Sequence, residues 1–332
     1  MIFLILLTVM ILGSIRGFET RPSSFPLSCA QVLRAILVLL VIFHHLPSFV
    51  NSFIRFIQTA CGRYAVTLFF FMSGYGLFLQ YEKNKVTFLN SFFSRRYIKL
   101  LLPYVTVWFL YAFCCDNYSL ECFIDNIITG ENVIPFAYFV EELAIFYLIF
   151  YLSFKYFTYP RGFILLLVLT IIMMGSFLFL GWNTHWWTSS LGFPTGILVC
   201  RYRTHLCRLN TTTCLLVVIA SILAYISRTQ EDLIPRSVFF TLVFSPLCCL
   251  IISMCFPLLK WTQSRYSALN YIGNISYEMY LIQGVILTMN LPWNRELNSL
   301  AVVTLTIITG TALHFIVQKQ RKQINKLFLE KN

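Results

Sequence analysis

Two ionisable residues interrupt the apolar segment 31–50, and their spacing is the most informative feature of the sequence. Arg34 and His45 are separated by eleven helical steps, which at 100° per residue amount to about 20° beyond three full turns. They therefore share one helix stripe, roughly 16 Å apart along the axis. Ionisable side chains within a membrane helix are costly and mark function by default. The arginine can hold an anion, and the histidine can move a proton near neutral pH.

Three basic residues gather where another apolar segment begins. Arg95, Arg96 and Lys99 stand ahead of the run that contains Pro103. Arginine side chains hold phosphate oxygens through paired hydrogen bonds, so the cluster predicts a binding site for an anionic cofactor. Ordinary anchoring of a helix end by basic residues explains the same pattern.

Acidic residues interrupt two further apolar runs. Glu141 and Glu142 are adjacent and cannot share one helix face, so at most one of them is expected to face His45. The alternative is a carboxyl group that snorkels, or stays protonated, near the outer surface. Glu278 follows Tyr277 in a later segment, where it serves either as a structural partner of an arginine or as part of a site.

Small residues occur in the second apolar segment, at Ser73 and Gly74. They either let two membrane helices approach closely or open space for a ligand. The sequence leaves both interpretations open.

Composition identifies the kind of molecule that must position these residues. The 332 residues are 58% hydrophobic and 11% charged, whereas soluble proteins carry about 25% charged residues. The fold class is therefore predicted to be all-α and polytopic in the membrane, with about ten transmembrane helices. The predicted spans are 31–50, 61–80, 97–115, 134–155, 162–181, 186–200, 212–227, 237–259, 268–290 and 299–318.

The distribution of positive charge predicts the orientation of these spans. If the segment before the first span lies inside, the inner segments hold 20 of the 25 Lys and Arg residues and the outer loops hold five. This asymmetry follows the positive-inside rule and places the C-terminus in the cytoplasm. It also explains the net charge of +12 without a nucleic-acid partner.

The chain divides into three predicted parts. Residues 1–29 form an apolar N-terminal segment with a short basic inner tail, in which residues 1–14 are expected to be a tilted or half-inserted helix, or else a signal-like segment. Residues 30–320 form one transmembrane domain, and residues 321–332 form a basic cytoplasmic tail. His205 and His314 receive no functional role, and the cysteine spacing predicts no metal site.

Five motifs in sequence order resemble those of the acyltransferase-3 family of integral-membrane acyltransferases, which includes O-acetyltransferases of bacterial surface polysaccharides. They are the R-x10-H pair at Arg34 and His45, a slightly loosened form of the F-F-x-x-S-G-[FY] block at 70–75, the R-R-x-x-[RK]-x-x-P-type loop at 95–103, the V-E-E block at 140–142, and the G-x-I-S-Y-x-x-Y-L-x-H motif at 273–283. The last motif ends in Gln283 instead of histidine, so no role is carried over to that position.

The resemblance implies a reaction and its participants. The donor would be cytoplasmic acyl-CoA, most simply acetyl-CoA, acting as a co-substrate with no permanently bound cofactor. The acceptor would be a hydroxyl group of a cell-surface sugar or polysaccharide, and the protein would lie in a bacterial inner membrane.

The implied roles fall on the residues already singled out. His45 would be the general base or carry a transient acyl group, while Arg34 would hold the donor or stabilise developing negative charge. One of the two adjacent glutamates would orient the imidazole. The phosphates of the donor would bind to Arg95, Arg96 and Lys99, and the substrate pocket would include Ser73, Gly74, Tyr277 and Glu278.

Two other classes of function are compatible with the sequence. A transporter or flippase for a polysaccharide or lipid-linked sugar could use the same buried charges, but no paired broken segments in matching halves are visible. A non-catalytic scaffold or receptor would have no obvious use for the aligned Arg34 and His45. A requirement for a thioester donor distinguishes the acyltransferase from both.

Overall fold

The structure is a computed structural model, and it describes residues 27–46, 52–114, 119–203, 237–254, 267–289 and 295–329. These residues contain helices and no strand, which confirms the all-α prediction for this part of the chain. The helices in chain order are α2 (Leu27–His45), α3 (Ser52–Lys83), α4 (Lys85–Asn90), the π-helix η1 (Phe93–Tyr97), α5 (Ile98–Cys114), α6 (Leu120–Thr129), α7 (Tyr138–Tyr156), α8 (Arg161–Phe179), α9 (His185–Thr188), α10 (Gly192–Arg201), the π-helix η2 (Phe240–Phe244), α14 (Ser245–Met254), α16 (Ser267–Asn274), α17 (Ser276–Thr288) and α18 (Arg295–Leu329).

Most of the predicted spans correspond to helices. The predictions at 97–115 and 162–181 agree with α5 and α8 to within a few residues at each end. The second helix is longer than the predicted 61–80, because no proline interrupts α3 between Ser52 and Lys83. The predicted span 212–227 and the apolar segment 1–14 lie outside the described residues.

Two predicted spans are broken helices. The sixth, 186–200, consists of α9 and α10, and Pro194 is the third residue of α10, where the missing N–H costs no helical hydrogen bond. The ninth, 268–290, is divided at Ile275 between α16 and α17.

The C-terminal helix α18 is longer than expected. It continues to Leu329, so the segment 321–332 is helical through that residue instead of forming only a tail. The reason is composition, because Gln, Lys, Arg and Leu dominate the last turns and all favour helix. The extension places Arg321 on a helix that packs against α17 and α5.

The predicted outer loop between the third and fourth spans contains an additional helix, α6. The Ser119 side chain accepts a hydrogen bond from the Cys122 amide at 3.2 Å and caps its N-terminus. Gly130, with φ 75°, ends it in the left-handed conformation that glycine adopts readily.

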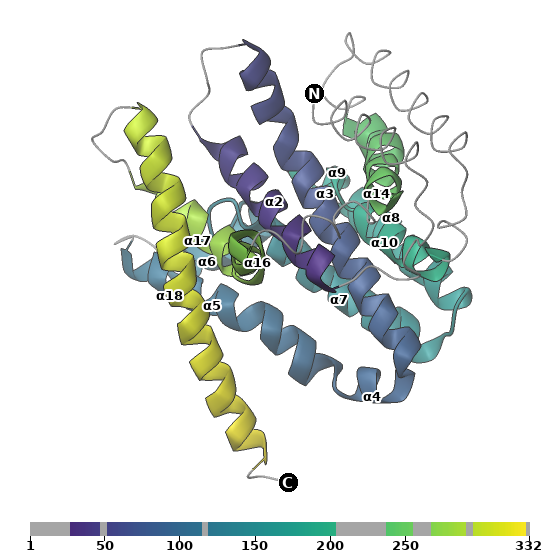
Figure 1. Cartoon of the computed structure of the whole chain (residues 1–332). Coiled ribbons are helices and arrows are strands. Elements are labelled where there is room, and N and C mark those ends of the chain that lie inside the picture. Colours follow the sequence, from purple (N-terminus) through teal and green to yellow (C-terminus); the bar gives the residue numbers. More distant parts are fainter. Residues whose placement is uncertain are drawn as a thin grey trace.

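Close helix packing builds the centre of the molecule (Figure 1). The most extensive contacts join α3 to α10 and α2, α2 to α16, and α17 to α18. Gly192 and Gly196 of α10 lie against the backbone carbonyl oxygens of Thr67 and Phe71 in α3, where a larger side chain would collide. Small residues thus bring the two helix backbones together.

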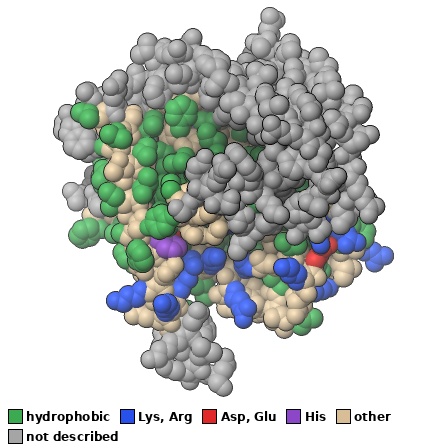
Figure 2. Space-filling model, in the orientation of Figure 1, with side chains coloured by type: hydrophobic (Ala, Val, Ile, Leu, Met, Phe, Trp, Pro, Cys, Tyr) green, Lys and Arg blue, Asp and Glu red, His purple; other side chains and the backbone are tan. Residues whose placement is uncertain are grey.

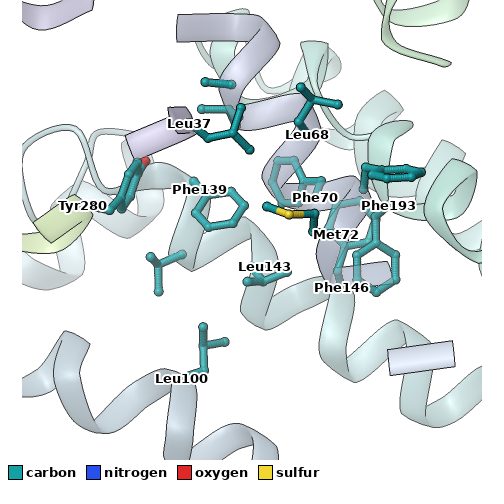
Figure 3. Close-up of a cluster of buried hydrophobic side chains, with 14 of the residues drawn as sticks. Leu37, Leu68, Phe70, Met72, Leu100, Phe139, Leu143, Phe146, Phe193 and Tyr280 are labelled. Atoms are coloured by element: carbon teal, nitrogen blue, oxygen red, sulfur yellow. The ribbon is translucent and has the colours of Figure 1, made fainter. Parts of the chain in front are cut away.

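An aromatic core fills the space among α3, α7 and α10 (Figure 3). The ring centroids of Phe70 and Phe139 are 4.7 Å apart, and those of Phe146 and Phe193 are also 4.7 Å apart in a stacked pair. These side chains are almost completely inaccessible to solvent. The core fixes α7, and therefore the two adjacent glutamates, relative to α3.

Apolar surface remains outside this core. Two described helical segments are long and apolar enough to cross a membrane, Arg161–Phe179 and Leu297–Ile324, while Cys29–His45 and Ser237–Ser253 are shorter apolar helices. On α8 the side chains of Ile164, Ile171 and Phe179 are exposed, as expected for a surface that lipid covers. The ten-span arrangement stays a prediction.

Lys and Arg side chains gather at one end of the described surface, below a broad hydrophobic region (Figure 2). This separation has the form that a membrane protein needs, with apolar surface at bilayer depth and cations beyond it.

Candidate active site

Helix α2 presents Arg34 and His45 at opposite ends of one stripe, as the spacing predicts. Arg34 is half-buried, and its guanidinium group lies within electrostatic range of the Tyr147 hydroxyl on α7. The same hydroxyl interacts with Arg96 of η1. The Arg34 end of α2 is therefore close to the basic helix η1 that follows α4.

Four basic side chains from four elements gather at the Arg34 end of α2, and we call Arg34, Arg96, Lys99 and Arg321 the cation cluster. The Lys99 ammonium group interacts electrostatically with the guanidinium groups of the other three members. Lys99 is exposed and the arginines are half-buried, so the cluster is open to solvent on one side. Such a concentration of positive charge attracts anions.

Arg321 is a member that the sequence did not predict. Its Nη2 donates to the Lys99 carbonyl oxygen at 3.1 Å, across 222 positions of sequence. Its position near the C-terminus suggested a basic tail, and only the continuation of α18 brings it to α5. The helix-favouring composition of residues 319–329 is the sequence feature that could have predicted this position of Arg321.

One carboxylate lies among these cations. Glu278 interacts with both Lys99 and Arg321, and its Oε1 pairs with His314 Nδ1 at 2.9 Å. His314 therefore has a specific structural partner in Glu278. The pairing depends on how α17 and α18 pack, which spacing within α18 does not reveal.

Tyr277, the neighbour of Glu278, donates its hydroxyl to the Leu100 carbonyl oxygen at 2.6 Å. The two residues thus join α17 to α5 and α18 beside the cation cluster. Of the predicted substrate-pocket residues, these two lie near predicted donor-binding groups.

Arg95 lies at a cavity beside the cation cluster and is not a member of that cluster. Together with Arg96 it lines a cavity of about 220 Å³ that also includes Lys83, Asn84 and Thr87. We call this the basic cavity. The sequence spacing predicts that Arg95, Arg96 and Lys99 form one binding group. In the structure, Arg95 lines the basic cavity, Lys99 belongs to the cation cluster, and Arg96 contributes to both.

At the other end of α2, the His45 ring lies 4.2 Å from the Phe136 ring and 4.9 Å from the His44 ring, centroid to centroid. Among the described residues, its imidazole nitrogens make no hydrogen bond. His44 is instead held by the Gln58 carbonyl oxygen, 2.7 Å from Nδ1. The neighbouring histidines thus differ: His44 is hydrogen-bonded to Gln58, whereas His45 makes only ring contacts among the described residues.

Phe136 has an unusual backbone conformation for an aromatic residue, with φ 62°. Such left-handed positions cost free energy and are found where the surroundings enforce them, often at functional sites. Here the Phe136 carbonyl oxygen accepts from the Tyr280 hydroxyl at 2.8 Å, and Gly284 packs on the Pro135 carbonyl oxygen. No sequence pattern identified Phe136 as a wall of the His45 site.

The two adjacent glutamates have separate partners. Tyr104 donates to Glu141 Oε1 at 2.6 Å, and the backbone amides of Val133 and Ile134 also hydrogen bond to that carboxylate. Glu142 is fully buried and accepts from the Ser190 hydroxyl at 2.5 Å. The expectation of different faces is met, but neither carboxylate makes a direct contact with His45 within the described residues.

Ser73 and Gly74 are part of the contact between α3 and α10. Ser73 Oγ donates to the Phe69 carbonyl oxygen at 2.9 Å in its own helix. Gly74 faces the Phe193 carbonyl oxygen so closely that a methyl group would collide. Close helix packing, one of the two interpretations of these small residues, describes Gly74 and leaves no ligand space at that position.

Gln283 occupies the position where the resembled motif has histidine. Its side chain is completely buried, and neither amide atom has a hydrogen-bond partner in the described part of the chain. A buried amide without hydrogen-bond partners is unfavourable for the fold.

Comparison with protein families matches residues 28–318 to acyltransferase-3, described as an acyltransferase domain. Comparisons with curated proteins and with solved structures found no match. The family match covers α2 through most of α18 and includes every residue predicted for the site. The chain therefore belongs to the acyltransferase-3 family and is a membrane acyltransferase.

Proposed function

We propose that this protein transfers an acyl group, most simply acetyl, from cytoplasmic acyl-CoA to a hydroxyl group of a cell-surface sugar or polysaccharide. The observation that carries the proposal is the arrangement along α2. Cations meet at its Arg34 end, and an imidazole without a protein hydrogen-bond partner among the described residues stands at its other end. A donor with an anionic head and a long thioester arm matches that arrangement.

The cations bind the anionic head of the donor. Arg95, Arg96 and Lys99 supply the charge, and Arg34 extends it toward the interior. Guanidinium groups suit this role because they hold phosphate oxygens in pairs and stay charged at all physiological pH values. The thioester then lies toward His45, since the two ends of the stripe are roughly 16 Å apart.

His45 is the general base of the transfer. An imidazole nitrogen takes the proton of the acceptor hydroxyl as its oxygen bonds to the thioester carbonyl carbon. The tetrahedral intermediate collapses by breaking the carbon–sulfur bond, and the CoA thiolate receives the proton from the imidazolium. A variant in which His45 itself carries the acyl group would pass it across the membrane in two steps.

Glu141 positions His45 through the protein instead of by direct contact. Its carboxylate holds the amides of Val133 and Ile134, and the loop continues to Phe136, on which the imidazole packs. Glu142 supports the fold around Ser190.

The test is thioester turnover by the purified protein in detergent. Labelled acetyl-CoA should yield free CoA thiol with the native chain, and His45→Ala should abolish this release while the protein still inserts in the membrane. His44→Ala is the matched control, because His44 bonds to the Gln58 carbonyl oxygen and should leave release within a few-fold of the native rate. Full release by the His45 variant would overturn the proposal. A folded protein that neither releases CoA nor binds acetyl-CoA would favour the transporter or flippase.

A further inference from the structure

The predicted donor-binding residues divide between two sites that share one arginine. Arg96 belongs to the cation cluster through Lys99, and it also lines the basic cavity beside Arg95. Its guanidinium carbon lies 5.8 Å from the centroid of the Phe88 ring. This cation–π contact helps to hold the Arg96 side chain between the two sites. The two sites are therefore neighbours at the basic end of the molecule.

The basic cavity has the chemistry of a site for a phosphorylated polar group. Lys83, Arg95 and Arg96 contribute charge, and Gln80 and Asn84 contribute amides at its wall. Lys83 and Arg95 are exposed, so a soluble ligand can reach them.

Glu82, which precedes Lys83 in the chain, is not among the residues that line the cavity. Glu82 is engaged elsewhere, by Arg203 at 2.7 Å and by Arg201 at 3.1 Å. Within the described part of the chain, the cavity thus keeps an excess of positive charge, which favours an anionic occupant.

The cation cluster also carries an excess of charge, and Arg321 is central to it. Arg321 bonds to the Lys99 carbonyl oxygen through Nη2, while its buried Nε has no partner among the described residues. Glu278 offsets part of the charge and is itself paired with His314. Four cations against one carboxylate repel one another, and a polyanion between them would offset that repulsion.

We propose that the basic cavity binds the 3′-phosphate of the donor nucleotide, and that the cation cluster, with Arg321 as a further binding residue, holds the donor diphosphate. The inference rests on the proposed acyl-CoA-dependent function and refines it. CoA carries these two anionic groups separately, and the diphosphate is the one attached to the thiol-bearing arm. The cluster includes Arg34, from which the stripe leads to His45, so the diphosphate belongs there and the 3′-phosphate in the cavity.

The experiment compares acetyl-CoA with its 3′-dephospho analogue as donors. Lys83→Ala should raise KM for acetyl-CoA about tenfold, the size of one lost charge-assisted hydrogen bond, and leave KM for the analogue unchanged. Arg321→Ala should raise KM for both donors by the same factor. Lys85→Ala is the matched control, because Lys85 lies over the Tyr81 ring and outside the cavity wall, and it should change neither value.

Three outcomes would overturn the inference while the acyltransferase proposal stands. Equal effects of Lys83→Ala on both donors, or no effect on either, would remove the 3′-phosphate from the cavity. Native KM values in Arg321→Ala would remove Arg321 from the diphosphate site.

A binding measurement separates the inference from failure of the proposed function itself. If the native protein releases no CoA, calorimetry with adenosine 3′,5′-bisphosphate and adenosine 5′-monophosphate tests the cavity directly. A preference for the bisphosphate that Lys83→Ala removes would support the cavity assignment even so. Equal affinity of the folded native protein for both nucleotides would overturn it.

Discussion

Glu141 and Glu142 are adjacent in α7, yet they meet different chemical demands. Three donors converge on Glu141, namely the Tyr104 hydroxyl and two backbone amides of the loop that leads to Phe136. One donor, the Ser190 hydroxyl, meets Glu142. A carboxylate offers acceptor sites on both oxygens, whereas an amide offers them on one. The difference in partners therefore assigns Glu141 a role in positioning the site and Glu142 a role in helix packing.

Paired substitutions to glutamine test this separation. Glu141→Gln should lower kcat for thioester transfer about tenfold or more with little change in donor KM, because the amide cannot accept all three hydrogen bonds and the loop under His45 shifts. Glu142→Gln should keep kcat within about twofold, because its amide oxygen still accepts from Ser190 and no charge is buried. Steady-state kinetics with acetyl-CoA measures both. Equal losses in the two variants would contradict the assignment.

Sequence periodicity predicts which residues share a helix face, but it does not predict contacts between distant segments. Spacing within one helix placed Arg34 and His45 on a single stripe, because helical periodicity is local. Phe136, Arg321 and the pairing of His314 with Glu278 depend on contacts between segments far apart in the chain. The hydrophobic periodicity of a single helix does not indicate such contacts.

At the scale of elements, α3 and α10 depend on glycine for their approach. Gly74, Gly192 and Gly196 each lie against a backbone carbonyl oxygen of the facing helix. Because backbone atoms cannot rotate away as side chains can, an added methyl group must move a helix. Gly76, also in α3, has no atom within 4 Å of the place where a Cβ would stand.

Two alanine substitutions in α3 should therefore have opposite effects on stability. Gly74→Ala should destabilise the protein by about 1–3 kcal/mol through overpacking. Gly76→Ala should be neutral or stabilising by up to about 1 kcal/mol, since alanine favours helix over glycine. Thermal unfolding in detergent, followed by loss of the monodisperse peak, measures the two midpoints. A stable Gly74→Ala variant would show that α3 and α10 are not packed as described.

The ends of helices could be predicted where a hydrophobic run is bounded by charged residues or proline. Where no such residue is present, the sequence does not define the end of the helix. Helix α5 begins beside Arg95 and Arg96 and ends two residues before Asp116, and α8 begins directly after Pro160. The break at Ile275 has no proline, and it coincides with the contact of Gly273 on the Gln31 carbonyl oxygen of α2. Packing, and not local preference, shapes that boundary.

Across the whole molecule, the fold brings the predicted anion-binding residues together at one end. The basic cavity, the cation cluster and the last turns of α18 lie at the same end, because Arg321 bonds to Lys99 and Arg96 belongs to both sites. The distribution of Lys and Arg along the sequence predicted the asymmetry of positive charge, and Figure 2 shows Lys and Arg side chains together at one end. Which residues of that end form a binding site required the tertiary structure.

This shared location makes the C-terminus a reporter for the side of the membrane on which the donor binds. Basic residues favour the cytoplasmic side, so the C-terminus is predicted to face the compartment that holds acyl-CoA. A green fluorescent protein fused after residue 332 should fluoresce in bacterial cells, while alkaline phosphatase at the same place should be inactive, since it needs an oxidising compartment to form its disulfides. Each reporter controls for the expression of the other. Active phosphatase with dark fluorescent protein would place the cation cluster outside, where no acyl-CoA reaches it, and would contradict both the orientation and the proposed donor.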